Sequence, residues 1–324
     1  MKKNDYPKIS IVILNWNGLK YTIECLESLK KSTYPNYEVI VVDNGSKGND
    51  ADILEEKYKG YIKLIRNKEN LGFPGGSNIA IKQIIAQGES DYVLLLNNDA
   101  KIIQKDWLDK LVKVGEKEEN IGIVGCTLLF PSGKFQLGGR ALKNPFYFIT
   151  GIFSEVNISD NVKNFIEVDV VEGACFMIKN KVIDKIGSLD ENFRPGAYED
   201  ADYCIRAKRA GFKVIYVPDI KIIHYGSVSS KKLEEADYIN KKNYLRFAFL
   251  NFSLSGIILC FPFMFAVCFF ERKDKNKKMS LRNLKIRKNW REYLNYSPRA
   301  IWDNLKALKE ISYKRRNRTQ KIWP

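Results

Sequence analysis

The chain has 324 residues, of which 45% are hydrophobic and 28% charged, so a sizeable core can form and global disorder is excluded. The formal net charge is +16, which indicates an acidic partner or surface. This charge is uneven: residues 231–324 hold about 23 Lys and Arg against about 8 Asp and Glu, so a nearly neutral body precedes a basic tail.

The cysteines and the N-terminus both indicate a reducing compartment. The six cysteines are far apart and none forms a C-x-x-C pair, which favours reduced thiols over a disulfide framework or a zinc site. The apolar run Ile11–Leu14 is too short for the core of a signal peptide. We therefore expect the body of the chain to stay in the cytoplasm.

Strands and helices are predicted to alternate through the first hundred residues. Continuous β-branched and aliphatic runs predict buried strands, and apolar residues at helical spacing predict helices between them. The predicted strands cover 8–14, 38–42, 61–65 and 92–96, and the predicted helices start at Gly18 and cover 50–59 and 77–87. This alternation predicts βαβ units and a mostly parallel sheet.

The pattern is less regular after residue 100. Pro131-Ser132-Gly133 and Gly138-Gly139 predict hairpin turns and an antiparallel excursion within 121–149. Strands are expected within 165–178, a helix over 199–210, and two short strands, 213–217 and 220–223, separated by Pro218-Asp219.

The basic tail contains an uncharged segment, 247–270, that is long enough to span a bilayer. Basic residues on both flanks favour an in-plane helix, or a hairpin turning near Pro262, over a single crossing. Residues 281–312 place Trp, Tyr, Ile and Leu among Lys and Arg, which is typical of an interfacial amphipathic helix. The alternative is a buried core helix with a solvated basic exterior.

Two acids stand where predicted parallel strands end. Asp43 follows the strand at 38–42, and Asp99 follows the strand at 92–96. Ligands of open α/β sheets bind beyond these carboxyl ends, where an acid can accept hydrogen bonds from a ribose or hold a divalent cation. Taken singly, each acid is equally well explained as a turn or helix-cap residue.

A glycine-rich turn lies between these acids. Asn70-Leu71-Gly72-Phe73-Pro74-Gly75-Gly76-Ser77-Asn78 precedes a predicted helix, so its backbone could approach a phosphate or sugar. It has neither the G-K-[ST] ending of a Walker loop nor the G-x-G-x-x-G pattern. By itself it reads as a tight turn.

An acidic cluster and the single histidine complete the candidate residues. Glu199, Asp200 and Asp202 open a predicted helix, where the helix dipole favours acids, but one of them could also deprotonate a hydroxyl. His224 follows a predicted strand and is either a packed side chain or a metal ligand.

Six motifs in this order resemble glycosyltransferase family 2, closest to its rhamnosyltransferase-like and galactofuranosyltransferase-like members. They are Ile11–Gly18, Val41–Ser46, Asn70–Phe73, Leu95–Asp99, Glu199–Asp202 and His224, and the resemblance covers about residues 8–228. It implies a GT-A fold and an inverting transfer from a nucleotide-diphosphate sugar.

The resemblance also implies roles for individual residues. Asp200 matches the catalytic base, with Glu199 and Asp202 shaping its field, and Asp99 and His224 match ligands of a Mg²⁺ or Mn²⁺ ion. The implied donor-binding residues are Asn15, Asn17, Asp43, Asn44, Gly72, Phe73, Gly76, Asn78, Asn97 and Asn98. Many members have D-x-D or D-D-D where this chain has Asn97-Asn98-Asp99, so diphosphate oxygens and water are expected to supply more of the coordination.

We therefore expect an α/β catalytic domain over 1–230 and a helical, membrane-associating tail over 231–324. The expected donor carries UDP or dTDP, and the expected acceptor is a glycan linked to polyprenyl diphosphate. The tail would hold the chain at the cytoplasmic face of the membrane, peripherally or monotopically, on an anionic surface, and no nucleic acid partner is expected.

Two other readings of the sequence remain. An inactive GT-A scaffold at the membrane would keep the fold without the chemistry. A nucleic-acid-binding protein would explain the basic tail, but not the acids at strand ends in a neutral body.

Overall fold

The computed structural model describes residues 6–141, 154–155, 165–226, 236–253, 255, 257–258, 270–272, 284–286 and 290–317. Its contacts divide the chain into two compact units, which we describe separately. The first comprises 1–139, 156–233 and 319–324, and the second comprises 140–155 and 234–318.

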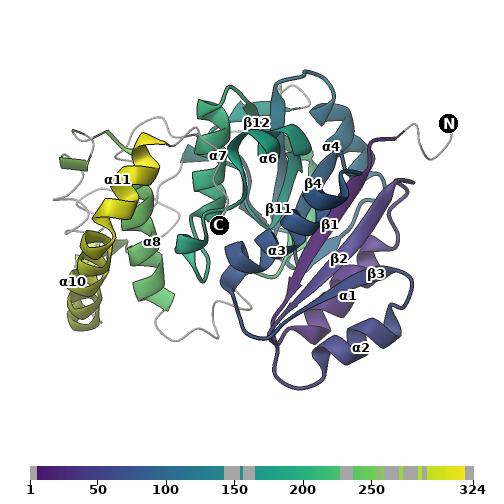
Figure 1. Ribbon diagram of the computed structural model, residues 1–324, viewed down its shortest axis with the longest axis horizontal. Coiled ribbons are helices and arrows are strands. Elements are labelled where there is room, and N and C mark those ends of the chain that lie inside the picture. The colour runs from purple at the N-terminus through teal and green to yellow at the C-terminus, as the bar shows by residue number, and fades with distance from the viewer. Residues whose placement is uncertain are drawn as a thin grey trace. The chain divides into compact units, whose positions relative to one another are not determined.

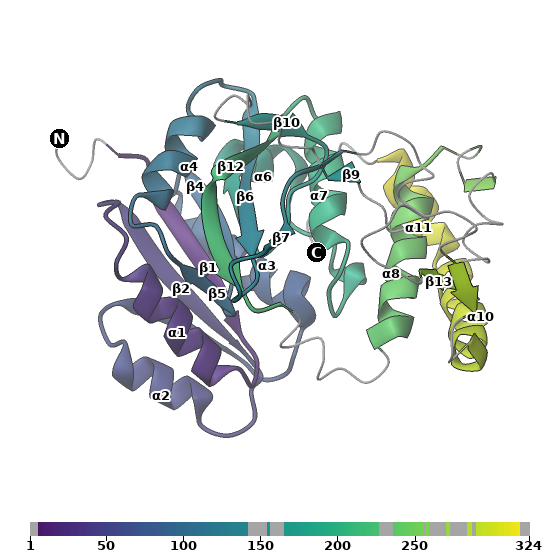
Figure 2. The same cartoon turned by 180° about the vertical axis from the view of Figure 1, so that it is seen from behind.

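A ten-stranded mixed sheet forms the centre of the first unit (Figures 1 and 2). Its strand order is β10-β12-β6-β11-β4-β1-β2-β3, with β5 paired to β12 and β7 paired to β6. The strands are β1 (Ile9–Asn15), β2 (Tyr37–Asn44), β3 (Ile62–Asn67), β4 (Tyr92–Asn97), β5 (Ala100–Ile102), β6 (Ile121–Leu129), β7 (Phe135–Leu137), β10 (Ile166–Val168), β11 (Cys175–Lys179) and β12 (Lys213–His224).

The parallel half of this sheet agrees with the sequence prediction. β1 pairs in parallel with both β2 and β4, and β2 pairs in parallel with β3. Ile9, Ile11 and Ile13 of β1 are fully buried in the core, as expected for a strand covered on both faces. The hairpin expected at Pro131-Ser132-Gly133 is confirmed, because β6 and β7 flank this turn and pair antiparallel. A second antiparallel element is β11, which lies between β4 and β6 and is antiparallel to both.

Helices cover both faces of the sheet. The right-handed crossovers that connect strands in the order 3-2-1-4 place α1 and α3 on opposite faces (Figures 1 and 2). The helices of this unit are α1 (Leu19–Leu29), α2 (Asp50–Lys57), α3 (Gly72–Gln87), α4 (Trp107–Gly115), α6 (Asn180–Ile186), the 3₁₀ turn η2 (Glu191–Phe193) and α7 (Glu199–Arg209).

Two predicted boundaries differ from the structure. The glycine-rich turn is not a loop before a helix, because α3 already begins at Gly72 and includes the glycines. The two short strands expected around Pro218 are one strand, β12, whose register against β6 shifts between Val217 and Lys221. This shift lets the strand pass Pro218, which has no amide hydrogen to donate.

Helices dominate the described part of the second unit. They are α8 (Ala236–Asn251), α10 (Trp290–Lys306) and α11 (Leu308–Arg316), and the short hairpins β8 (Arg140–Ala141) with β9 (Ser154–Glu155) and β13 (Phe270–Arg272) with β14 (Leu284–Ile286) accompany them. Tyr238 and Leu245 of α8 pack with Ala300 of α10 in a small core.

The membrane expectation for 247–270 concerns residues of which most lie outside the described part of the chain. No helix within the described part is both long enough and apolar enough to traverse a bilayer.

Four cysteines are buried free thiols, as the sequence predicted: Cys25, Cys126, Cys175 and Cys204.

Candidate active site

The predicted site residues lie at the carboxyl edge of the parallel strands. Asn15 at the end of β1 is level with Asp43 of β2, and Leu14 is level with Asn97 of β4. The residues that follow β4 therefore emerge beside those that end β1 and β2, where open α/β sheets bind ligands.

A relay of buried hydrogen bonds links these strand ends. The Asn98 amide donates to the Thr22 hydroxyl (2.9 Å), which donates to Asn15 Oδ1 (2.7 Å), and Asn15 Nδ2 donates to Asp43 Oδ1 (2.9 Å). The other oxygen of Asp43 accepts a hydrogen bond from the backbone of Ser46 (3.2 Å). The structure thus brings Asn15, Asp43 and Asn98 together through Thr22, a residue that the sequence analysis missed.

His224 lies against Asp99 and Asn97. Its Nε2 is 3.2 Å from Asp99 Oδ1 and 3.2 Å from Asn97 Nδ2. This proximity follows from the pairing of β12 with β5, which places His224 opposite Ala100, the residue after Asp99. The structure thus brings the two predicted metal ligands together.

Gln136 on β7 contacts the other nitrogen of this ring. Gln136 Oε1 is 2.9 Å from His224 Nδ1, so the ring can donate its Nδ1–H there and present an unprotonated Nε2 to Asn97 and Asp99. Gln136 was not among the predicted residues, because a lone glutamine in a hairpin gives no sequence signal.

The donor set suits a hard divalent cation that takes other ligands from a substrate. A carboxylate oxygen and an imidazole nitrogen converge within 3.2 Å, but no cluster of three or more His, Cys, Asp or Glu side chains forms among the described residues. A cation held here would therefore depend on phosphate or water oxygens for most of its coordination. The arrangement of side chains is thus compatible with the sequence prediction of a cation site that contains a single carboxylate.

The segment that precedes β11 links Asp200 to Asn97. Its Oδ2 accepts a hydrogen bond from the backbone N–H of Gly173 (2.8 Å), while the carbonyl of the next residue, Ala174, accepts one from the Asn97 N–H (3.1 Å). A side chain on Gly173 would lie 3.3 Å from the Asp200 carboxylate, so glycine permits the close approach. The backbone of 173–174 thus bridges Asp200 and Asn97.

The start of α7 carries backbone strain. Ala197 and Tyr198, immediately before the helix, have φ angles of 80° and 71°, a region that non-glycine residues rarely adopt. Such outliers persist where the surrounding structure over-determines them, and they cluster at functional sites. They place the first turn of α7, with Glu199 and Asp200, beside Gly173.

Glu199 differs from Asp200 in its environment. It is 7% exposed, and its Oε2 atom has no hydrogen-bond partner. Burial, and secondarily the negative charge of Asp200, raise the pKa of Glu199 to about 8. Glu199 is therefore mostly protonated at neutral pH.

Asp202 forms a buried ion pair with Arg206. The Arg206 Nε lies 3.1 Å from Asp202 Oδ2, and both side chains are fully buried. Arg206 also donates to the carbonyls of Ile186 and Ser188, which fastens α7 to the end of α6. These contacts give Asp202 a structural role, and its influence on Asp200 remains a prediction.

Asn44 organises the glycine-rich turn. Its amide donates to Asn70 Oδ1 (3.0 Å) and to the Gly72 carbonyl (3.1 Å). Gly72 has a φ of +73°, and a side chain there would come within 2.8 Å of the Pro195 backbone. Phe73 donates its N–H to the Pro195 carbonyl (2.7 Å), so the turn is fixed against that segment.

The remaining donor candidates also make internal contacts. Asn78 exchanges hydrogen bonds with the Leu189 backbone (3.0 Å each), and Asn17 accepts one from the Lys47 N–H (2.7 Å). A side chain on Gly76 would lie 2.7 Å from the Leu14 side chain. These internal contacts are sufficient to explain why asparagine or glycine occupies each position. The donor-binding roles of Asn17, Gly76 and Asn78 stay predictions.

Replacing Arg206 with Met should remove the guanidinium that pairs with the buried Asp202 carboxylate, and breaking such a buried ion pair costs about 3–5 kcal/mol of unfolding free energy. Urea unfolding followed by circular dichroism would measure the loss. Adding Asp202→Asn to this variant removes the buried carboxylate charge and should recover part of the unfolding free energy. A single variant as stable as the unmodified chain would contradict the importance of the pair.

Replacing Glu199 with Gln should change how stability depends on pH. The pKa of Glu199 is raised from 4.5 to about 8 on folding, so the folded chain keeps a proton that the unfolded chain loses, and stability falls as pH rises between these values. The Gln side chain does not titrate, so the variant does not lose stability over this pH range. Its melting temperature at pH 8 should exceed that of the unmodified chain by a few degrees, since 1 kcal/mol shifts the melting temperature by about 2–4 °C in domains of about 150–250 residues. The gain should shrink at pH 5. An equal gain at both pH values would show that Glu199 does not titrate as described.

Comparison with known sequences identifies relatives of this chain. It is 30% identical over 241 residues to an uncharacterized protein y4gI of Sinorhizobium fredii, and 29% identical over 245 residues to the O-antigen biosynthesis protein RfbC of Myxococcus xanthus. These alignments cover 69% and 72% of this chain but only 25% and 18% of the relatives, so the chain spans a quarter or less of their length. It is also 25% identical to the low-salt glycan biosynthesis hexosyltransferase Agl10 of Haloferax volcanii, with 70% of each chain covered.

Two solved structures share the fold. One is GalNAc-T7 with UDP, GalNAc and Mn²⁺ (TM-score 0.58, 17% identity, 75% of this chain and 48% of that chain). The other is the mannosyltransferase PcManGT of Pyrobaculum calidifontis with GDP-Man and Mn²⁺ (TM-score 0.54, 14% identity, 94% of this chain and 77% of that chain). At these identities the likeness establishes the GT-A fold alone.

The sequence profile of the family described as glycosyl transferase family 2 matches residues 10–187, more than half of the chain. This match includes the strand ends that carry Asn15, Asp43 and Asp99. The chain therefore belongs to glycosyltransferase family 2.

Proposed function

We propose that this chain is an inverting glycosyltransferase that moves a sugar from a nucleotide-diphosphate donor to a hydroxyl of a glycan acceptor. The observation that carries the proposal is the joining of Asp99, His224 and Asn97 to Asp200 through the backbone of 173–174. A cation-binding pair and an anchored carboxylate thus lie at one sheet edge, beside the relay that ends at Asp43.

The nucleoside part of the donor is assigned to the Asp43 side of this edge. Both oxygens of Asp43 already accept one hydrogen bond each, and each retains capacity for another from a base or ribose. Asn15 donates to Asp43, Ser46 and Asp50, which fixes the orientation of the Asp43 carboxylate.

The diphosphate is assigned to the Asp99–His224 pair. A divalent cation bound there would supply positive charge against the leaving diphosphate. Asp99 offers a carboxylate oxygen, and His224 offers Nε2 when Gln136 holds the proton on Nδ1. Mn²⁺ accompanies the sugar nucleotides of both structural neighbours, which supports a divalent cation without distinguishing Mg²⁺ from Mn²⁺.

Asp200 would act as the general base in a single displacement. Its carboxylate takes the proton of the acceptor hydroxyl as that oxygen forms a bond to the anomeric carbon, and the bond from this carbon to the diphosphate oxygen breaks on the opposite face. The Gly173 N–H orients the Asp200 carboxylate, and protonation of Glu199 removes a negative charge from beside it. One displacement inverts the anomeric configuration.

The identity of the substrates is part of this proposal. Relatives named for O-antigen and glycan biosynthesis support a role in bacterial cell-surface polysaccharide synthesis. We propose a UDP- or dTDP-linked donor, a rhamnose-like or other hexosyl group, and an acceptor on polyprenyl diphosphate. The chain would then act at the cytoplasmic face of the membrane, on an anionic surface.

Asp200→Asn and Asp99→Ala should separate catalysis from donor binding. The Asn variant keeps the size of the side chain but loses the base, so turnover should fall about 10²–10⁴-fold with nucleotide affinity nearly unchanged. The Ala variant should weaken Mn²⁺-dependent nucleotide binding as well. Calorimetry with UDP, dTDP and GDP, with and without Mn²⁺, measures the binding, and release of the nucleotide measures turnover.

The same titrations test the scaffold alternative. Metal-dependent binding of one nucleotide would support the transferase. A folded chain that binds none of the three nucleotides would favour the inactive scaffold. Equal loss of binding in both variants would contradict the separate roles of Asp200 and Asp99.

Gln136→Ala should lower Mn²⁺ affinity, because the ring of His224 loses the acceptor that holds its proton on Nδ1. Removing such an outer partner costs roughly 10–100-fold in metal affinity. Electron paramagnetic resonance of Mn²⁺ titrated in the presence of UDP measures the change. Gln136→Glu keeps an acceptor oxygen and is the matched control, which should retain affinity; equal affinity in all three proteins would exclude a positioning role.

A further inference from the structure

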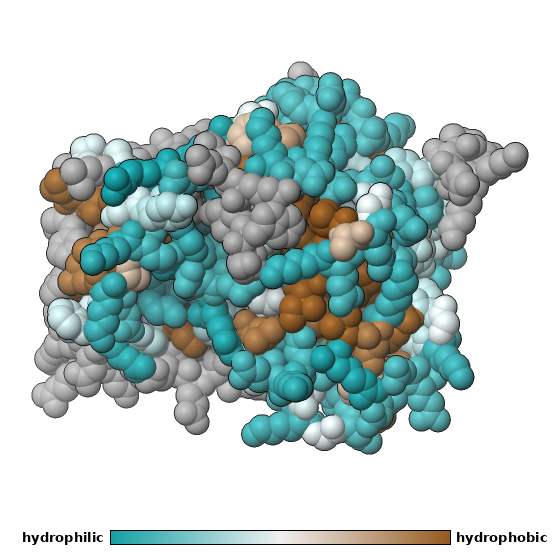
Figure 3. Space-filling model, in the orientation of Figure 1, coloured by the Kyte–Doolittle hydropathy of each residue, from teal (hydrophilic) through white to brown (hydrophobic). Residues whose placement is uncertain are grey.

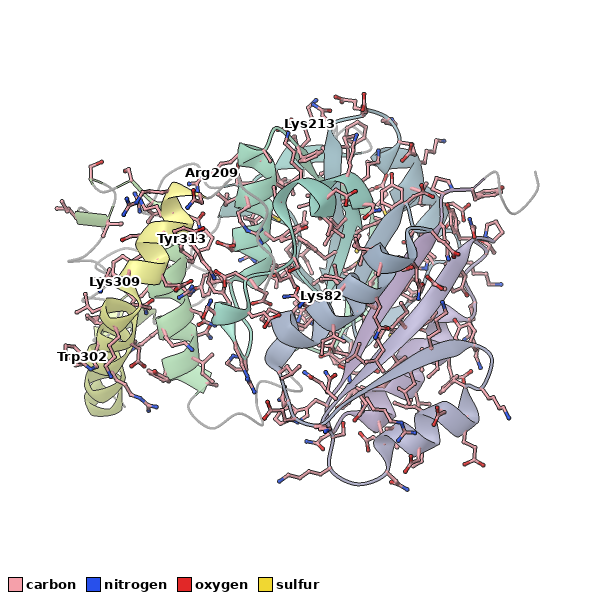
Figure 4. The ribbon with its side chains drawn as sticks, in the orientation of Figure 1. Lys82, Arg209, Lys213, Trp302, Lys309 and Tyr313 are labelled. Atoms are coloured by element: carbon pink, nitrogen blue, oxygen red, sulfur yellow. The ribbon has the colours of Figure 1, made fainter. Side chains whose placement is uncertain are left out.

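The last two helices of the second unit carry a row of side chains that we call the outer stripe. Its members recur at three- and four-residue intervals, which places them on one face of the helical segment formed by α10 and α11. They are Trp302, Leu305, Lys306, Lys309, Tyr313 and Arg316. Figure 4 labels three of them along these helices, and Figure 3 shows hydrophobic groups interspersed with hydrophilic ones in this region.

The apolar members of the outer stripe are well exposed. Trp302 is 59% exposed, Tyr313 is 67% exposed and Leu305 is 43% exposed. Single exposed apolar residues are ordinary on protein surfaces, but three on one helical face form a patch of the kind that marks an interaction site.

Among the described side chains of α10 and α11, the two acids lie off the outer stripe. The Tyr238 hydroxyl donates to Asp303, and Glu310 pairs with Arg246 (2.6 Å) and with Lys314 (2.8 Å). Both acids are thus half-buried and engaged beside the stripe, whereas Lys306, Lys309 and Arg316 are exposed on it. The outer stripe therefore contains three cations and no carboxylate.

The opposite face fixes the stripe in place. Ala300 and Ile311 are buried, and Asn304 donates to the Lys242 carbonyl of α8 (3.0 Å). Arg315 donates to the Phe249 carbonyl of α8 (2.6 Å). Because buried contacts on the other side hold both helices, α10 and α11 present a preformed surface.

We propose that the outer stripe docks on an anionic lipid bilayer, with α10 and α11 lying in the plane of the headgroups. Trp and Tyr are enriched at the membrane interface, Leu inserts among acyl chains, and Lys and Arg are attracted to anionic headgroups. A bilayer supplies the apolar layer and the negative charge in one partner. A second copy of the same face would bring cations against cations, and a nucleic acid would leave the Leu and Trp side chains without an apolar partner.

The proposal concerns a surface outside the catalytic residues, so it can be tested on the full chain without reference to transfer activity. The measurement is co-sedimentation with vesicles of phosphatidylcholine alone and of phosphatidylcholine mixed with phosphatidylglycerol. Lys306→Glu with Lys309→Glu removes the attraction, and Trp302→Ser with Tyr313→Ser removes the interfacial side chains. Because all four residues are exposed, both variants should fold, and their melting temperatures should match that of the unmodified chain.

Matched controls come from the first unit. Lys59→Glu with Lys82→Glu makes the same change of charge at exposed lysines, and Ile103→Ser removes an exposed apolar side chain (48%). The proposal expects the unmodified chain and both controls to bind the anionic vesicles, and each stripe variant to bind about tenfold or more weakly. It also expects weaker binding of the unmodified chain to neutral vesicles.

Three results would overturn the proposal. The first is failure of the unmodified chain to bind anionic vesicles, or equal binding to neutral ones. The second is an equal loss of binding in the stripe variants and their controls, which would indicate net charge alone. The third is self-association that the stripe variants abolish while vesicle binding is unchanged, which would assign the face to a second copy.

Discussion

The candidate active site depends on one continuous run of buried hydrogen bonds, from Asn98 through Thr22 and Asn15 to Asp43. These side chains are shielded from water, and a buried polar group without a partner costs about 1–3 kcal/mol. The relay satisfies them together, and in doing so it fixes the end of β4 relative to the ends of β1 and β2. Gly18 is part of this constraint, because a side chain there would come within 2.6 Å of the Asn98 amide.

The second constraint is the different electrostatic environment of two neighbouring carboxyl groups. Glu199 is shielded from water, with one oxygen unpartnered, whereas Asp200 is half-buried and accepts hydrogen bonds from the backbone of Gly173 and Ala201. The two backbone donors orient the Asp200 carboxylate, whereas burial disfavours the ionised form of Glu199. Two adjacent acids thus lie in different surroundings, one anchored by backbone donors and one desolvated.

The parts of this arrangement that sequence reasoning could predict are those with a repeated local pattern. Apolar runs such as Ile9–Leu14 predict strands, and an acid within three residues of the end of such a run predicts a residue at the sheet edge, as found for Asp43 and Asp99. The family resemblance added the fold, which the family match and the structural neighbours confirm.

The remainder depends on contacts between residues distant in the chain. Thr22 and Gln136 belong to the site through partners 76 and 88 positions away, and no local pattern signals such a pair. Asp202 is indistinguishable from Asp200 in sequence, but the side on which it leaves α7 directs it to Arg206. The sequence also does not predict that α3 starts at Gly72, because glycine is a poor helix former. The need for glycine at this position comes from its packing against the Pro195 backbone.

The sparse donor set at Asp99 and His224 has a thermodynamic consequence. With Asn97 and Asn98 in place of further carboxylates, the proposed pair would contribute one negative charge to a cation, and a diphosphate would bring several more. Cation and nucleotide would then complete each other's binding site, and linkage requires each to raise the affinity of the other by the same factor. The two would bind as a cooperative pair. After the sugar has been transferred, the cation and the nucleoside diphosphate would therefore be released together.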